Sequence, residues 1–251
     1  TVTVSLSVSG KQVDSVNVRT GFRTISVEKG ELHLNGKRIF LAGFNRHEDS
    51  VESGAAFDEG SMRRDLEMMK AAGANTVRLC HYPHHELELD FCDELGLYAL
   101  AEIPLYFWDD KEEGLAENEL RVSAARRQLE TMITRDRNHP SVILWSVSNE
   151  TNEEHEEVCE SNRDLIKFAR MLDSSRLCVH VSNHWRTHPN FAEDDIICIN
   201  AYPSIEWDKN GRLPGASLDS SKAAWQENLA KLANDFPGKP ILVTEFGYCS
   251  I

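Results

Sequence analysis

The sequence of 251 residues has no run of roughly 20 apolar residues, and no basic segment followed by an apolar core stands at its start. We therefore expect no membrane partner and see no targeting segment. Basic residues are also scarce. The formal net charge of −14 opposes binding to nucleic acid, because that affinity depends on Lys and Arg neutralising phosphates. The same charge disfavours an anionic ligand and leaves a neutral one unaffected.

Paired cysteine motifs and common metal motifs are missing as well. The six cysteines are scattered without C-x-x-C spacing, which is typical of reduced thiols buried as small apolar side chains. Reduced thiols favour a cytoplasmic location. The ten histidines show no H-E-x-x-H or comparable spacing. These patterns predict no metal site and no cofactor.

Short apolar runs alternate with helical patterns from Ile39 onward, which is typical of a (β/α) barrel. A first helix is predicted over 61–73 with Ser61 as its N-cap, and Gly96 ends a second helix over 86–94. Further helices are predicted over 120–135, 154–171 and 221–232. The seven predicted strands cover residues 39–44, 76–80, 97–102, 142–148, 177–181, 196–200 and 241–244.

A closed barrel of this type has eight strands. The sequence therefore predicts a (β/α)8 TIM barrel that lacks its last strand in this chain. Unpaired edges on the first and seventh strands invite pairing with another chain. We expect the isolated chain to be weakly active and marginally stable, to form homo-oligomers or to be completed by sequence beyond it.

The chain before the barrel has the two-residue period of β-strands. Apolar and polar residues alternate from Val2 to Val8, a turn follows at Gly10, and a returning strand is predicted over 16–19. This pattern predicts the edge of a β-sandwich. A second hairpin, over 25–34, leads into the barrel.

Two glutamates stand at the polar ends of apolar runs. Glu150 closes the run that begins at Val142, and Glu245 closes the run that begins at Ile241. Either glutamate alone could be an ordinary solvated strand end. The carboxyl ends of parallel strands meet at one face of a barrel, however, so we expect the two carboxylates to converge there. Two converging carboxylates are the groups that cleavage of a glycosidic bond requires.

Other polar side chains follow the same strand ends and predict a polar pocket. A sugar site needs hydrogen-bond donors for the hydroxyls and an aromatic platform. The polar residues at these ends are Asn45 to Glu48, Arg78, His81 to Pro83, Glu102, Asn149, His184 with Trp185, and Asn200 to Tyr202.

The motifs at these positions resemble glycoside hydrolase family 2, the family of β-galactosidases and β-glucuronidases. The resemblance extends from about Gly21 to Gly247. Residues 1–20 are similar to the end of the immunoglobulin-like domain that precedes the barrel in this family, so we predict that domain at 1–20 and the barrel at 21–251. The motifs are Gly43-Phe-Asn-Arg-His-Glu48, Val77-Arg-Leu-Cys-His-Tyr-Pro83, Asn138-His-Pro-Ser-Val142, Trp145-Ser-Val-Ser-Asn-Glu150 and Thr244-Glu-Phe-Gly247.

The resemblance implies an exo-acting, retaining β-glycosidase whose partner is a carbohydrate substrate. Glu150 would be the general acid/base and Glu245 the nucleophile of a double displacement. Asn149 would hydrogen-bond the sugar 2-hydroxyl, and Arg78 and Tyr202 would flank the nucleophile. The remaining predicted substrate-binding residues, which surround these groups, are His47, His81, Glu102 and Trp185.

The sequence also departs from the family pattern. Tyr106 and Trp108 stand where metal-dependent members carry a Glu and a His, so the resemblance implies no magnesium site. The glycone stays open: Asn45-Arg-His47 is more similar to galactosidases, and the length of the segment after Tyr202 is more similar to glucuronidases. Two alternatives also stay open. One is an inactive truncated barrel that serves as a carbohydrate-binding or scaffold fragment, and the other is a cellulase-like endo-enzyme of the same clan, which would lack the Arg-His-Glu and His-Tyr-Pro signatures.

Overall fold

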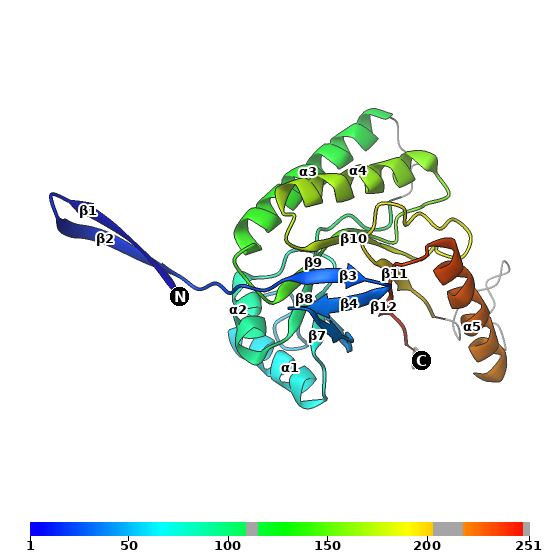
Figure 1. Cartoon of the computed structure of the whole chain (residues 1–251), viewed down its shortest axis with the longest axis horizontal. Helices are drawn as coiled ribbons and strands as arrows, with labels where there is room; N and C mark the ends of the chain where they lie inside the picture. Colours follow the sequence, from blue (N-terminus) through cyan, green and yellow to red (C-terminus); the bar gives the residue numbers. More distant parts are fainter. Residues whose placement is uncertain (109–114, 203–217, 248–251) are drawn as a thin grey trace.

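A computed structural model describes residues 1–108, 115–202 and 218–247, and within them seven parallel strands form one sheet. The strands lie side by side in the order of the sequence, from β6 to β12, as in a TIM barrel (Figure 1). The predicted barrel architecture is confirmed. The strands are β6 (Gly43–Arg46), β7 (Thr76–Leu79), β8 (Tyr98–Glu102), β9 (Val142–Asn149), β10 (Leu177–Ser182), β11 (Ile197–Asn200) and β12 (Ile241–Glu245).

Helices cover the outer face of this sheet. Leu66, Leu129 and Leu165, one from each of three helices, are fully buried in one cluster with the strand residue Trp145. None of the helices in the described ranges is long and apolar enough to cross a membrane. The helices are α1 (Glu59–Ala71), α2 (Glu86–Leu95), α3 (Leu115–Asp136), α4 (Glu156–Leu172) and α5 (Leu218–Asp235).

The ends of the first two helices test the predicted caps. Asp58, not Ser61, is the N-cap of α1, because its carboxylate accepts hydrogen bonds from the backbone N–H groups of Gly60 (3.0 Å) and Ser61 (3.2 Å). The prediction of Ser61 was therefore wrong. Gly96 ends α2 in the left-handed conformation, with φ +67°, as predicted.

The first barrel strand begins later than predicted. Residues 37–39 form β5 (Lys37–Ile39), which pairs with β4 (Glu31–Leu34), and β6 starts only at Gly43. The side chain of Asn75 pairs with backbone polar groups between the two strands. It donates to the Phe40 carbonyl (2.7 Å) and accepts from the N–H of Ala42 (2.9 Å). The sequence pattern merged the two strands because both are short and apolar residues continue between them.

A three-stranded antiparallel sheet closes the end of the barrel opposite to the strands' carboxyl ends. It consists of β3 (Ile25–Glu28), β4 and β5, and Leu32 joins the cluster that contains Leu177 and Ile196 from the start of β10 and β11. Arg23 donates to the carbonyl groups of Pro140 and Val142. This sheet therefore packs against the amino ends of the barrel strands.

The chain begins with a hairpin of β1 (Val2–Val8) and β2 (Lys11–Val18), which extends away from the barrel (Figure 1). The returning strand is longer than predicted, because the pairing of the two strands continues to the turn at residues 9–10. Apolar side chains of the hairpin are exposed, with Val4 at 57% and Leu6 at 61%.

Within the described residues, the sheet has two edges: β6 pairs only with β7, and β12 pairs only with β11. One side chain crosses between these edges, because Asn45 Nδ2 donates to the carbonyl of Thr244 at 3.0 Å. A cavity of about 710 Å³ lies along both edge strands and extends to Arg78.

Candidate active site

Glu150 and Glu245 lie at the carboxyl face of the barrel, where the sequence places them. Glu150 follows the last residue of β9, and Glu245 is the last residue of β12. The backbone of Glu150 has φ +51°, and its N–H donates to the carbonyl of Val181 at 2.8 Å. The chain therefore turns sharply out of the strand at this glutamate, a conformation that is uncommon for residues other than glycine.

The carboxylate of Glu245 accepts one hydrogen bond on each oxygen. Arg78 Nη1 donates to Oε1 at 2.7 Å, and the hydroxyl of Tyr202 donates to Oε2 at 2.7 Å. The Glu245 charge and its hydrogen bond add to the effect of burial in raising the pKa of the Tyr202 phenol. A guanidinium and a phenol that donate to the same carboxylate stabilise its ionised form, which is the form a nucleophile requires.

Glu102, the last residue of β8, is fully buried and anchors Arg78. It receives hydrogen bonds from Arg78 Nη2 (2.9 Å), His81 Nδ1 (2.7 Å) and Ser146 Oγ (2.8 Å). Burial alone would raise the pKa of Glu102, but Arg78 and His81 outweigh it and lower the pKa. Glu102 therefore stays charged and fixes the orientation of Arg78 toward Glu245.

Glu150 has a different environment. Burial raises its pKa and the charge of Glu245 adds to the rise, while a 2.6 Å hydrogen bond from Asn200 Nδ2 opposes it. Asn183 Nδ2 lies 3.3 Å from the other carboxyl oxygen. One carboxyl group of the site accepts hydrogen bonds from a guanidinium and a phenol, and the other has a raised pKa. These are the environments that a nucleophile and a proton donor require.

The side chain of Asn149 is oriented by two donors. Its Oδ1 accepts hydrogen bonds from Arg78 Nη2 (2.7 Å) and Asn200 Nδ2 (3.0 Å). The amide oxygen therefore already accepts from two protein donors, which leaves the NH2 group to donate to a ligand. Asn149 is thus set up to contact a sugar hydroxyl.

His47 and His81 lie together beside these carboxylates. Their ring centroids are 5.2 Å apart in an edge-to-face arrangement, and His81 Nε2 lies 3.7 Å from Glu245 Oε1. Because the ionised carboxylate of Glu102 can only accept, the proton on His81 belongs on Nδ1. His81 Nε2 therefore faces the nucleophile, where a sugar hydroxyl could reach it.

Trp185 does not share this network. It is 4% exposed, packs among Phe191 and Ile199, and donates its indole N–H to the carbonyl of Asn200 at 3.1 Å. It therefore supports the backbone of Asn200 from within the core. Tyr106 is 47% exposed, and its ring centroid lies 6.0 Å from that of His81, so it offers an exposed aromatic face beside this histidine.

Asn200 was grouped with Tyr202 from the sequence but was not predicted as a substrate-binding residue. No role was predicted for Asn183 or Ser146. Asn200 joins Glu150 to Asn149, and its Oδ1 also accepts from the hydroxyl of Thr244 at 2.8 Å. The available signal was its position as the last residue of a barrel strand. Ser146 lies within the motif from Trp145 to Glu150, but the motif does not show that its hydroxyl donates to Glu102.

A buried charge cluster anchors the loop that follows Glu150. His180 is fully buried, with Nε2 at 2.9 Å from Glu153 Oε1 and Nδ1 at 2.9 Å from Asp194 Oδ1. Ser182 Oγ also donates to Glu153. Burial disfavours the charged imidazole, but Asp194 and Glu153 outweigh burial and raise the pKa of His180 to about 10. Glu153, three residues beyond Glu150, is thus held by a cation within the core.

We expect replacement of His180 with glutamine to destabilise the protein by about 3–5 kcal/mol near neutral pH, because it leaves buried carboxylates without their cation. A raised pKa in the folded state gives stability that is fully present below the unfolded value and is lost as pH rises toward about 10. Denaturant unfolding of both proteins at about pH 6 and about pH 9.5 checks this. The difference between them should shrink at the higher pH, and a pH-independent difference would contradict a charged His180.

A (β/α) barrel that carries two converging carboxyl groups among polar donors is the arrangement of a glycoside hydrolase. The chain belongs to glycoside hydrolase family 2: residues 25–251 match the family described as "Glycosyl hydrolases family 2, TIM barrel domain". The resemblance seen in the motifs is confirmed.

Individual relatives are β-glucuronidases and β-galactosidases. The chain is 32% identical to a β-glucuronidase of Paenibacillus borealis over 95% of its own length, and 34% identical to a β-galactosidase of Vibrio cholerae over 77%. Among solved structures, it superposes with a TM-score of 0.88 and 28% identity on the β-glucuronidase of Ruminococcus gnavus in complex with uronic deoxynojirimycin, over 98% of this chain. The chain spans 40% of the length of the first relative, 18% of the second and 42% of the third.

Proposed function

We propose that the protein is, or belongs to, an exo-acting β-glycosidase that retains the configuration of the sugar. The observation that carries this proposal is the contrast between two carboxyl groups: Glu245 accepts hydrogen bonds from Arg78 and Tyr202, while burial raises the pKa of Glu150. Retaining enzymes need one carboxylate to attack and one carboxylic acid to donate. The proposed separation of the two carboxyl groups is about 5 Å, which is typical of retention.

In the first step, a carboxylate oxygen of Glu245 attacks the anomeric carbon, and the bond from that carbon to the leaving oxygen breaks. Glu150 gives its proton to that oxygen, so the aglycone departs as a neutral alcohol. The amide NH2 of Asn149 donates to the sugar 2-hydroxyl, a contact that strengthens as positive charge develops on the ring. Formation of the bond removes the negative charge of Glu245, so this charge no longer contributes to raising the pKa of Glu150.

In the second step, Glu150 is a carboxylate and acts as the base. It takes a proton from a water molecule, whose oxygen attacks the anomeric carbon and breaks the ester bond to Glu245. Arg78 and Tyr202 then stabilise the carboxylate of Glu245 as it leaves. Two inversions give net retention, and both carboxyl groups return to their starting states.

We propose a β-glucuronide as the first candidate substrate and a β-galactoside as the second. The β-glucuronidase of Paenibacillus borealis aligns with 95% of the chain and the β-galactosidase of Vibrio cholerae with 77%, and the matched glucuronidase structure is in complex with uronic deoxynojirimycin. The net charge of −14 acts against an anionic sugar, so a glucuronide would need a local cation.

We further propose that residues 1–20 are the end of an immunoglobulin-like β-sandwich domain and that the barrel domain spans 21–251. The exposed apolar side chains of the hairpin, among them Val4 and Leu6, support this division, because a β-sandwich would cover one face of it.

The stereochemical outcome tests the proposal. Aryl β-glucuronide, β-galactoside, β-mannoside and β-glucoside are offered in turn, and the anomer formed first is identified by proton NMR before mutarotation. We expect the β-anomer from the accepted substrate. The α-anomer as first product would indicate inversion, and binding of a β-glycoside without turnover would favour the alternative of a carbohydrate-binding fragment.

A further inference from the structure

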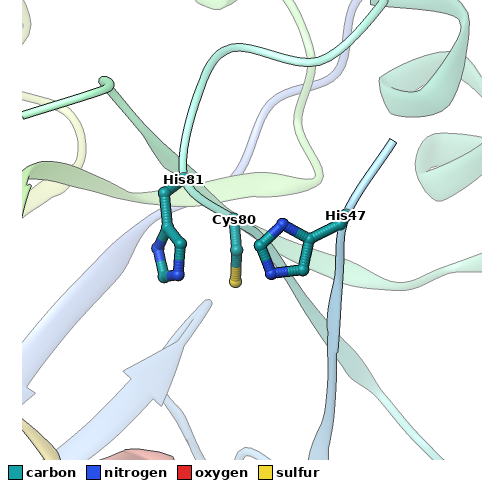
Figure 2. Close-up of side chains that lie close together, drawn as sticks. All are labelled: His47, Cys80 and His81. Carbon is teal, nitrogen blue, oxygen red and sulfur yellow. The ribbon is translucent and has the colours of Figure 1, made fainter. Parts of the chain in front are cut away.

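A histidine, a cysteine and a second histidine meet beside the proposed nucleophile (Figure 2). His47 follows the last residue of β6, whereas Cys80 and His81 follow the last residue of β7. The two strands are parallel neighbours, with Arg46 opposite Leu79, so the residues after each strand lie side by side. Figure 2 shows the thiol between the two imidazole rings, and one donor atom from each residue lies within 4.8 Å of the others.

This donor set suits a borderline-soft metal ion. Zn²⁺ takes imidazole nitrogen at about 2.0–2.1 Å and thiolate sulfur at about 2.3 Å, which places tetrahedral donors about 3.3–3.6 Å apart. The three donor atoms lie within 4.8 Å of one another, so the side chains would have to move closer together on binding. Magnesium, in contrast, prefers oxygen donors, so this site differs in kind from the magnesium site that the sequence argued against.

The neighbouring residues prepare both histidines as ligands. His81 Nδ1 lies 2.7 Å from a carboxylate oxygen of Glu102, which gives the carboxylate–histidine pairing found behind metal ligands and makes Nε2 the nitrogen that would face a metal ion. The His47 ring stands edge-to-face against His81, with the ring centroids 5.2 Å apart, so both rings border the same space.

Cys80 completes the set as a buried thiol. It is 1% exposed, and its S–H group donates to the carbonyl of Arg78 at 3.6 Å. Metal binding would break the S–H bond, form a metal–sulfur bond and release one proton to the solvent. The carboxylates of Glu102 and Glu245, paired with Arg78, leave a net negative surrounding that favours a cation.

We propose that His47, Cys80 and His81 bind a soft divalent cation of the Zn²⁺ class, and that the bound ion blocks the site and takes no part in the reaction. The binding half of the proposal, that these residues hold the ion, depends on this geometry alone. The inhibitory half, that the ion blocks the site, rests on the proposed glycosidase function. His81 Nε2 is 3.7 Å from Glu245, so the ion would occupy the space that the sugar needs.

Cobalt(II), a coloured substitute for zinc, tests the binding half without any activity measurement. Titration of the protein with Co²⁺ should give one equivalent of binding, with d–d bands of a tetrahedral site and a thiolate-to-metal charge-transfer band. Cys80→Ser and His47→Ala should each lose the charge-transfer band. Cys159→Ser is the matched control, because Cys159 is also buried, at 6% exposed, and its thiol donates to a backbone carbonyl as a hydroxyl could.

The charge-transfer band also separates this site from two other groups of possible ligands in the described residues, because neither contains sulfur. They are Glu154 with His184 and His188, and Asp90 with Asp93 and His139. No charge-transfer band in the parent protein, or a band that survives Cys80→Ser, would overturn the binding half.

Inhibition of hydrolysis by zinc tests whether the bound ion blocks the site. With an accepted aryl β-glycoside, Zn²⁺ should raise the apparent KM and leave kcat unchanged, and a chelator should restore activity, while Mg²⁺ has no effect. Expressed relative to the activity of each protein without metal, Cys80→Ser should weaken inhibition by at least about 100-fold, and Cys159→Ser should not. Noncompetitive inhibition, or equal inhibition of both variants, would overturn the block. If the protein hydrolyses no β-glycoside, the proposed function is wrong. The cobalt titration would still show whether the metal site exists.

Discussion

Replacement of Glu245 with glutamine should lower turnover of every accepted β-glycoside by about 10⁴-fold or more, because a neutral amide cannot attack the anomeric carbon. The amide has nearly the same size as the carboxylate and can still accept a hydrogen bond from Arg78 or from Tyr202. Substrate binding should therefore change far less than kcat. Steady-state kinetics on an aryl glycoside measures both, and near-ultraviolet circular dichroism checks that the variant is folded.

Glu227→Gln is the matched control, since it makes the same chemical change on an exposed position of α5. It should retain the parent's kcat. A Glu245→Gln variant that keeps more than about a tenth of the parent's kcat would show that another group attacks the sugar.

Replacement of Glu150 with alanine should have a graded effect that depends on the leaving group. Activated aryl groups need little protonation, so glycosylation should survive on them, while deglycosylation slows by about 10²–10⁴-fold because the base is missing. Added azide should restore turnover by attacking the intermediate without base assistance. The product should then be the β-glycosyl azide, formed by attack on the face that water would have taken.

Poor leaving groups provide the internal control for this variant. On alkyl β-glycosides, azide should give no rescue, because the first step still needs the missing acid. If the loss of activity is equal for good and poor leaving groups and is insensitive to azide, the proposed roles of Glu150 and Glu245 are wrong.

The sequence predicted the parallel barrel and the convergence of Glu150 with Glu245 because both follow from strand order alone. Once alternating strands and helices are recognised, the ends of strands far apart in sequence must share one face. The resemblance to the family implied that Arg78 and Tyr202 flank the nucleophile, and both donate hydrogen bonds to Glu245.

Features that depend on side-chain orientation could not be predicted in this way. Trp185 stands at a strand end like the others, yet it packs into the core, and Tyr106 is the more exposed ring. The proximity of His47 to Cys80 depends on the register between β6 and β7, which the sequence did not define, since the first strand was predicted over 39–44. Ser61 was chosen as a cap because local preference cannot separate it from Asp58, three residues earlier.

The two proposed reacting groups are held by different kinds of contact. Glu150 follows β9, which is hydrogen-bonded to a strand on each side, and Glu245 ends β12, where its carboxylate is held by side chains from β7 and from the residues after β11. The direction in which Glu245 faces the anomeric carbon therefore depends on Arg78 and Tyr202, so loss of either hydrogen bond would change the angle of attack.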